Sequence, residues 1–271
     1  MKKILTRIGL ILAIIAVVAG IGFAIYGIYK KATLNIPNPV ATMEVEGYGT
    51  IKIELYPDKA PNTVANFIRL ANRGYYNGKT FHRTIPNFVI QGGAEADLTS
   101  SPKLSDIMDN VETDKEYNIE GEFIANGYSN NNLKHEKGVI SMARSDYSSY
   151  SSSLTTQGYN SAAAQFFIMT EDNTQLDGIY AAFGRVTEGM DVVEKIANVE
   201  VYYRESELKD GETAPKDSDG NKIQSDTPKK QPVITSISVE TYGVDYGIPK
   251  TIDPFNITSW MMKNYGMFAN H

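Results

Sequence analysis

The apolar residues between Thr42 and Tyr242 come in short runs separated by turn residues, and this spacing limits the folds open to the chain. Apolar and polar residues alternate in 42–46 and 50–55, on either side of a glycine-rich turn, which predicts a hairpin. Further strands are predicted over 81–91, 139–142, 165–169, 181–186 and 233–242. Helical spacing occurs over 60–73 and 189–198. Because helices do not alternate with the strands, an antiparallel barrel is favoured over a parallel sheet.

Three polar segments interrupt this pattern. Residues 94–118 are polar and irregular, 145–163 are rich in Ser, Tyr and Thr, and 203–231 are rich in Lys, Asp, Glu and Pro. Such segments offer little apolar surface to a core, so they are expected to be surface insertions. Of the three, 145–163 is predicted to be a mobile loop.

The chain has no Cys and only three His, which are His82, His135 and His271. The lack of Cys excludes a disulfide framework, a thiolate zinc site, an iron–sulfur cluster and a cysteine nucleophile. The net charge of −6 argues against nucleic-acid binding. We expect no metal and no cofactor.

An uncharged run of 21 residues, from Ile8 to Ile28, lies near the N-terminus with basic residues on both sides. As a helix it would span about 31 Å, which matches a hydrocarbon core of about 30 Å. Residues 1–31 carry a charge of +5 and the remaining 240 residues carry −11. The run therefore predicts a transmembrane helix that acts as a signal-anchor.

A cleaved signal peptide, cut after Ala19, is the alternative interpretation of this run. Nine more residues without a charge follow Ala19, so the run is longer than a usual signal sequence and the anchor is favoured. The early basic residues Lys2, Lys3 and Arg7 favour a cytoplasmic N-terminus. We expect a single-pass protein of the cell membrane with an extracytoplasmic body, or a secreted protein if cleavage occurs.

The chain thus divides into four predicted segments. These are an anchor (1–31), a tether with two prolines (32–39), a folded domain (40–243) and a C-terminal extension (244–271). The extension is rich in aromatic residues and Met. We expect it to pack on the domain, with a partner-binding or membrane-surface segment as the alternative.

Several blocks of the domain occur in a recognisable order. They are FHRTIPNFVIQGG at 81–93, GEF at 121–123, KGVISMA at 137–143, QFFI at 165–168, LDG at 176–178 and FGRV at 183–186. Together they resemble the cyclophilin family of peptidyl-prolyl isomerases, over about residues 40–243. The resemblance implies a mainly β fold, an eight-stranded antiparallel barrel capped by two helices, with the active site on the outer face of the barrel.

The resemblance also implies a site. Arg83 matches the family's catalytic arginine, and Gln91 matches the polar residue that positions arginine and substrate. Four residues match the walls of the proline pocket, which are Phe88, Val89, Phe167 and Leu176. Two residues match the groove for the residues before proline, which are Ala143 and Gln165.

Four positions depart from the family pattern. Val89 replaces a common Met, which is a modest apolar change. At the rim of the groove, Gln175 stands where many members have Trp, Tyr180 where many have His, and Arg144 where many have Asn. These rim changes bear on inhibitor affinity and sequence preference more than on the reaction.

The implied chemistry suits these residue types. Rotation about an X–Pro bond crosses a barrier of roughly 18–20 kcal/mol, and at the top the proline nitrogen gains a lone pair. A catalyst needs a fixed cation near that nitrogen and an apolar cup for the ring, which are the roles assigned to Arg83 and the pocket. Because no proton is moved, His82 is expected to be a packed structural residue.

The expected function is isomerisation of X–Pro bonds in extracytoplasmic proteins, which assists their folding. The expected partners are proline-containing unfolded or secreted polypeptides, together with the membrane through residues 8–28. A non-catalytic proline-binding or chaperone module on the same scaffold is the alternative. The complete set of Arg83, Phe88, Gln91 and Phe167 favours the enzyme.

Overall fold

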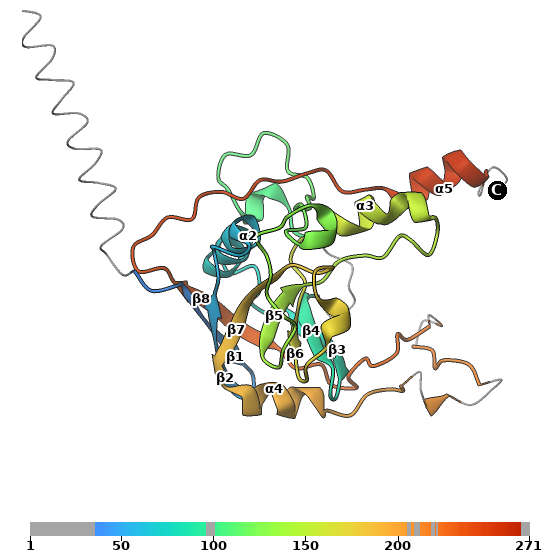
Figure 1. Cartoon of the computed structure of the whole chain (residues 1–271). Helices are drawn as coiled ribbons and strands as arrows, with labels where there is room; N and C mark the ends of the chain where they lie inside the picture. Colours follow the sequence, from blue (N-terminus) through green and yellow to red (C-terminus); the bar gives the residue numbers. More distant parts are fainter. Residues whose placement is uncertain are drawn as a thin grey trace, which may run out of the picture. The chain divides into compact units, whose positions relative to one another are not determined.

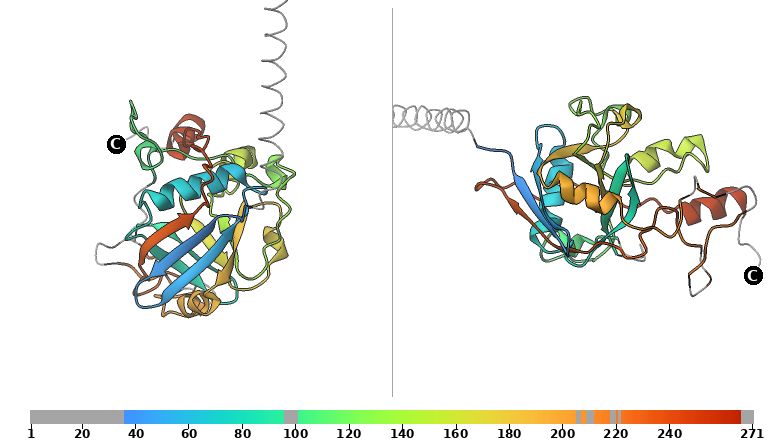
Figure 2. Two further views of the ribbon diagram at one scale, coloured as in Figure 1. Left: turned by 90° about the vertical axis from the view of Figure 1, so that its left-hand side faces the viewer. Right: turned by 90° about the horizontal axis from the view of Figure 1, so that it is seen from below.

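Eight strands form one antiparallel sheet in the order β3-β4-β6-β5-β7-β2-β1-β8. The strands are β1 (Val40–Val45), β2 (Gly49–Leu55), β3 (Thr80–Ile85), β4 (Val89–Ala94), β5 (Val139–Met142), β6 (Phe166–Met169), β7 (Ala182–Glu188) and β8 (Ile234–Glu240). The sheet curls until its two edge strands meet (Figure 2). There Thr80 bridges Val233, and the backbone N–H of Ile234 donates to the Lys79 carbonyl at 2.8 Å. The mainly β, eight-stranded antiparallel fold is therefore confirmed.

This computed structural model describes residues 36–95, 101–204, 207–208, 212–217, 220 and 222–266. The predicted membrane span over 8–28 lies outside these residues. Within them, no helix has the length and apolar character needed to cross a membrane.

The segment 81–91, predicted as one strand, is a hairpin of β3 and β4. The turn forms at Pro86-Asn87, where Asn87 has φ 58° and the N–H of Phe88 donates to the Ile85 carbonyl at 3.2 Å. Pro86 lacks a backbone N–H, and Asn tolerates the left-handed conformation better than most residues. Apolar residues on both sides of this short turn conceal it in the sequence.

Two helices cap opposite ends of the barrel (Figure 1). They are α2 (Pro61–Asn72) and α4 (Met190–Ala197), at the positions that the sequence predicts. Two further α-helices, α3 (Thr155–Tyr159) and α5 (Ile257–Tyr265), were not predicted. Single 3₁₀ turns occur at Leu104–Asp106, Ile124–Asn126, Ser152–Leu154 and Thr174–Leu176.

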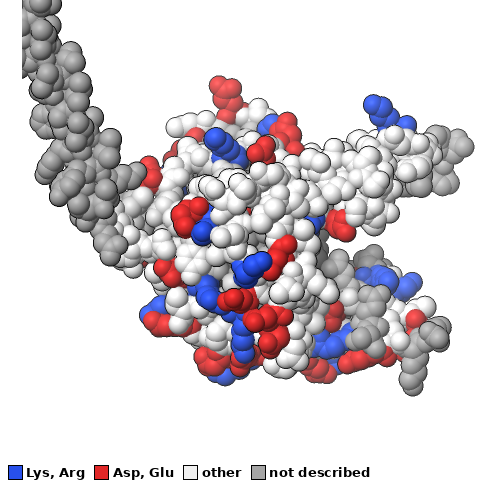
Figure 3. Space-filling view, viewed as in Figure 1, with Lys and Arg blue, Asp and Glu red and all other residues white. Residues whose placement is uncertain are grey.

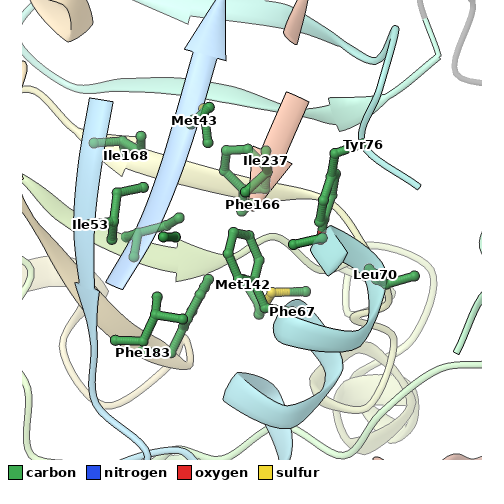
Figure 4. Packing of buried hydrophobic residues seen from close by; sticks show 14 of the residues in the cluster. Met43, Ile53, Phe67, Leu70, Tyr76, Met142, Phe166, Ile168, Phe183 and Ile237 are labelled. Atoms are coloured by element: carbon green, nitrogen blue, oxygen red, sulfur yellow. The ribbon is translucent and has the colours of Figure 1, made fainter. Parts of the chain in front are cut away.

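The core of the barrel is built around Phe67 of α2 (Figure 4). Its ring centroid lies 5.3 Å from that of Tyr76, 5.9 Å from Phe166 and 5.3 Å from Phe183. Aromatic pairs at such separations add to the free energy gained by burying their area. Phe81 is also fully buried here.

The N-terminus of α2 is capped from a distant segment of the chain. Pro61 occupies the first turn, but Ala60 at the N-cap has no side chain that can accept a hydrogen bond. The buried carboxylate of Glu122 accepts instead from the N–H groups of Asn62 and Thr63, at 3.0 and 2.8 Å, and from the Thr63 hydroxyl. An anion there also suits the positive end of the helix dipole.

The insertion before β8 covers the part of β3 that lies beyond its contact with the start of β8. The N–H of Thr84 donates to the Asp226 carbonyl at 2.9 Å, and Arg204 donates to the Thr84 carbonyl at 3.0 Å. Arg204 also forms an ion pair with Asp226 at 3.0 Å, and both side chains are largely buried. An edge strand with unpaired backbone groups is a site of aggregation, so this cover protects it.

Two other segments acquire local structure. The segment 145–163, expected to be a loop, contains a 3₁₀ turn, α3 and the buried Leu154. In the C-terminal extension, Gly247 accepts from Arg69 of α2 and Lys250 exchanges hydrogen bonds with Asn62. This part packs on the domain as expected, whereas α5 has no buried residue and its surface is almost uncharged (Figure 3).

We expect Glu122→Ala to lower the free energy of unfolding by about 2 kcal/mol, because the buried donors of Asn62 and Thr63 lose their acceptor. Urea unfolding followed by circular dichroism measures this. Glu120→Ala is the matched control, since Glu120 is an exposed neighbour of like charge and its loss should cost less than about 0.5 kcal/mol. Equal effects of the two substitutions would contradict the capping role.

The free energy of unfolding should also decrease as the pH is lowered, because of His82. Burial lowers the pKa of His82 to about 4, partly opposed by the Thr80 backbone, and Arg83 lowers it further. The unfolded chain binds this proton near pH 6.5, whereas the folded chain does not bind it until about pH 4. The contribution of His82 to the free energy of unfolding is therefore fully present above pH 6.5 and is lost as the pH falls to 4, by about 3 kcal/mol in total. In His82→Phe, the loss of unfolding free energy between pH 7.5 and 5 should shrink; an unchanged loss would contradict this account.

Candidate active site

Three polar and aromatic side chains stand in one row across neighbouring strands. Arg83 of β3 is paired with Gln91 of β4, and Gln91 is paired with Phe167 of β6. Side chains of directly paired residues lie on the same face of a sheet. The row therefore lies on one face, and that face is the outside of the barrel, because the neighbouring Phe166 points into the core.

A β-bulge at His82 sets the direction of Arg83. Phe81 pairs with Gly92 and Arg83 pairs with Gln91, so His82 is an extra residue without a partner in β4. In a regular strand Phe81 and Arg83 would share a face, and the bulge instead sends Phe81 into the core and Arg83 outside. Opposite Phe81 a side chain is excluded, since a Cβ on Gly92 would lie 2.8 Å from the Phe81 ring.

A cavity of about 140 Å³ opens beside this row, and we call it the Arg83 cavity. Its walls are Arg83, Phe88, Val89, Gln91, Ala143, Arg144, Phe167, Leu176 and Tyr180. The apolar members belong to a second hydrophobic cluster, separate from the barrel core, which includes Val89, Phe167 and Leu176. Phe167 and Tyr180 meet edge to face at 5.4 Å. The cavity thus combines an apolar wall with cationic side chains.

Arg83 is only partly buried, and within the described residues its guanidinium has no ion pair and no hydrogen bond. The amide nitrogen of Gln91 donates to the side-chain oxygen of Gln165 at 3.1 Å, which fixes the Gln91 side chain beside it. The Arg83 charge is therefore left for a bound molecule.

A second cavity of about 210 Å³ continues from the first along the sheet, and we call it the Gln165 cavity. It shares Gln91, Ala143 and Arg144 with the Arg83 cavity and adds Gln165, Ala163 and Ser161, among others. Because they share these three residues, the two cavities adjoin and form one groove.

Of the predicted rim residues Tyr180 and Gln175, only Tyr180 lines a cavity. Tyr180 lines the Arg83 cavity, whereas Gln175 is exposed in the 3₁₀ turn Thr174–Leu176 and lines neither cavity. The turn directs Leu176 inwards and Gln175 outwards. The other predicted site residues all border one or both cavities.

A buried histidine supports Phe167 from behind, and the sequence contained no signal for it. The His135 ring stacks on Phe167 with centroids 6.0 Å apart, and its two nitrogens lie 3.3 Å from the Asp177 carboxylate and 3.2 Å from the Ser141 hydroxyl. Burial lowers the pKa of His135, and Asp177 opposes this in part. The neutral imidazole packs against the ring of Phe167 and holds it in position.

The arrangement suits a reaction without proton transfer. Neither His82 nor His135 lines the two cavities, and no carboxylate does so among the described residues. Within the same residues, no cluster of His, Asp and Glu could hold a metal ion. The groove offers a cation, amide groups and an apolar cup.

Comparison with known proteins gives a consistent result. Residues 40–238 match the profile of the family described as cyclophilin type peptidyl-prolyl cis-trans isomerase/CLD. Peptidyl-prolyl cis-trans isomerase B of Bacillus subtilis is 36% identical over 158 residues, covering 58% of this chain and 90% of that protein. A peptidyl-prolyl cis-trans isomerase of Acinetobacter baylyi is 40% identical over 156 residues, covering 56% of this chain and 68% of that protein.

The fold is also similar to a solved structure. A cyclophilin-type isomerase from Cryptosporidium parvum, crystallised in the presence of the dipeptide Ala-Pro, superposes with a TM-score of 0.50 at 24% identity, over 74% of this chain and 98% of that one. At this identity the likeness concerns the fold alone. The family profile and the bacterial relatives carry the assignment further: the chain belongs to the cyclophilin-type peptidyl-prolyl cis-trans isomerase family.

Proposed function

We propose that the protein isomerises X–Pro bonds at the Arg83 cavity, that it acts on proteins outside the cytoplasm, and that it assists their folding. The observation that carries the catalytic part is the row of Arg83, Gln91 and Phe167, which combines an unpaired cation with an apolar wall. A protein that only bound proline would need the wall, but it would have no use for the cation beside it.

The mechanism follows from the electronic change in the substrate. As the X–Pro bond twists, conjugation is lost and the proline nitrogen gains a lone pair. The guanidinium of Arg83 donates an N–H to that lone pair, which exists only near the transition state, so the interaction lowers the barrier rather than merely tightening binding. Phe88, Val89, Phe167 and Leu176 hold the ring while the preceding carbonyl turns.

Gln91 has a positioning role in this proposal. Its amide nitrogen is bonded to Gln165, so its carbonyl oxygen is turned to other donors, and Arg83 is its direct partner across the strands. No hydrogen bond joins the two side chains in this structure, so in this proposal the fixed Gln91 amide accepts from the Arg83 guanidinium when the substrate binds and orients it there.

The cellular location is proposed from the sequence. The uncharged run over 8–28, with five basic and no acidic residues in 1–31, supports a signal-anchor. Newly translocated chains contain X–Pro bonds that isomerise over tens to hundreds of seconds without a catalyst. An isomerase anchored there would act on them as they fold.

We expect Arg83→Ala to reduce the isomerisation rate at least about tenfold, and up to about a hundredfold, because the lone pair loses its donor. NMR exchange spectroscopy on a proline peptide measures the rate with the full chain in detergent micelles. Binding of the peptide should fall much less, since the apolar wall remains.

The controls separate charge from geometry. Arg83→Lys should recover little activity, because an ammonium group lacks the planar fork of arginine. Arg185→Ala should leave the rate unchanged, since Arg185 lines neither cavity and pairs with Glu136. Full turnover by a folded Arg83→Ala protein would refute the mechanism and favour the binding-module alternative.

We also expect the native protein to remain with the membrane fraction after carbonate washing, and mass spectrometry to find residues 8–28 still attached. An arginine in the middle of the run, Ile15→Arg, should weaken membrane retention, because a charge at the centre of a spanning helix costs about 2.5–3.5 kcal/mol. A mature N-terminus near Gly20, recovered in the soluble fraction, would show that the run is a cleaved signal peptide.

A further inference from the structure

Arg144 lies on the wall that the Arg83 cavity and the Gln165 cavity share, and its guanidinium is held by rings and carbonyls. Its Cζ atom lies 4.5 Å from the ring centroid of Tyr180 and 4.9 Å from that of Tyr159. The Nε–H donates to the Ile179 carbonyl at 3.1 Å, and one terminal nitrogen donates to the Ser145 carbonyl at 3.2 Å. The side chain is therefore fixed in position.

These contacts do not neutralise the charge. Within the described residues Arg144 makes no ion pair. The nearby carboxylate of Asp146 accepts from the N–H and hydroxyl of Ser148, at 2.9 and 2.6 Å. A guanidinium has five N–H groups, so donors remain after the two carbonyl bonds. Arg144 is a pre-organised cation with unused donors.

The other residues of the groove add to the positive charge that Arg144 presents. The described walls of the two cavities contain Arg83 and Arg144 and no Asp or Glu, in a chain whose net charge is −6. A peptide carboxylate in the groove would meet two cations on the walls, and the nearby carboxylate is that of Asp146, which the Arg144 charge attracts and which Ser148 already binds. A peptide ammonium would meet the same two cations, so the walls favour an acidic over a basic side chain.

We propose that Arg144 makes the enzyme selective for substrates with an acidic side chain, Asp or Glu, at one of the two residues that precede the proline. This inference rests on the proposed isomerase function of the same site. The resemblance assigns Ala143 and Gln165 to the residues before proline, and both line the Gln165 cavity, so in this proposal those residues pass Arg144 when the proline ring occupies the Arg83 cavity. A planar guanidinium there can bind a carboxylate through two parallel hydrogen bonds.

The test uses the full chain in detergent micelles and three peptides that differ only in the residue before proline, which is Glu, Gln or Lys. NMR exchange spectroscopy measures turnover and chemical-shift titration measures binding. The unsubstituted protein should prefer the Glu peptide over the Gln peptide roughly three- to tenfold in kcat/KM, with the Lys peptide lowest. A second set places the same residues one position earlier. The preference at the sensitive position should shrink as salt rises.

Arg144→Gln should bring the ratio of Glu to Gln peptide close to one, and Arg144→Lys should keep part of it, since the charge remains without the fork. The matched control is Arg185→Gln, which removes the same charge from a residue that lines neither cavity, and it should keep the full ratio. Only the ratio is compared, so a change in overall rate does not affect the result.

The proposal is overturned if the unsubstituted protein handles the Glu and Gln peptides alike in both sets. It is also overturned if Arg185→Gln removes the preference as fully as Arg144→Gln. The preference would then come from the overall charge of the protein and not from Arg144. Turnover of all peptides without discrimination would leave the isomerase function intact. Conversely, tighter binding of the Glu peptide that depends on Arg144, without turnover of any peptide, would support the selectivity and contradict the isomerase function.

Discussion

The alternation of side chains across β3, β4 and β6, reset by one bulged residue, is the constraint on which the rest of the site depends. Phe81, Gly92 and Phe166 face the core, and Arg83, Gln91 and Phe167 face outwards. If His82 were paired as in a regular strand, Phe81 and Arg83 would share a face. Either the core would lose an aromatic ring or the site would lose its cation.

The site is built on an apolar cluster of its own. Phe167 takes part in it from one side and rests on the buried, neutral His135 from the other. Because a packed aromatic wall has few alternative rotamers, the cavity is formed before a ligand arrives. The Gln91 amide nitrogen and part of the Arg144 guanidinium are paired with protein groups, while neither arginine forms an ion pair within the described residues.

The segments outside the barrel strands have structural roles that their polar composition does not suggest. Glu122 caps α2, the insertion containing Arg204 and Asp226 covers the edge of β3, and the extension to Ile252 packs beside α2. Each role joins residues that are distant in sequence. A segment of polar composition can therefore contribute to stability and to the shape of the groove.

The sequence by itself determined the strand and helix periodicity, because alternation and helical spacing are local signals. The order of its motif blocks also indicated the family and most of the residues around the groove. The sequence did not determine the Pro86-Asn87 turn, the bulge at His82, the position of His135 behind Phe167 or the outward direction of Gln175. It also could not show that Arg144 is held by Tyr159 and Tyr180. These features depend on contacts between segments far apart in the chain, and only the tertiary structure decides them, because each is fixed by packing rather than by the preferences of neighbouring residues.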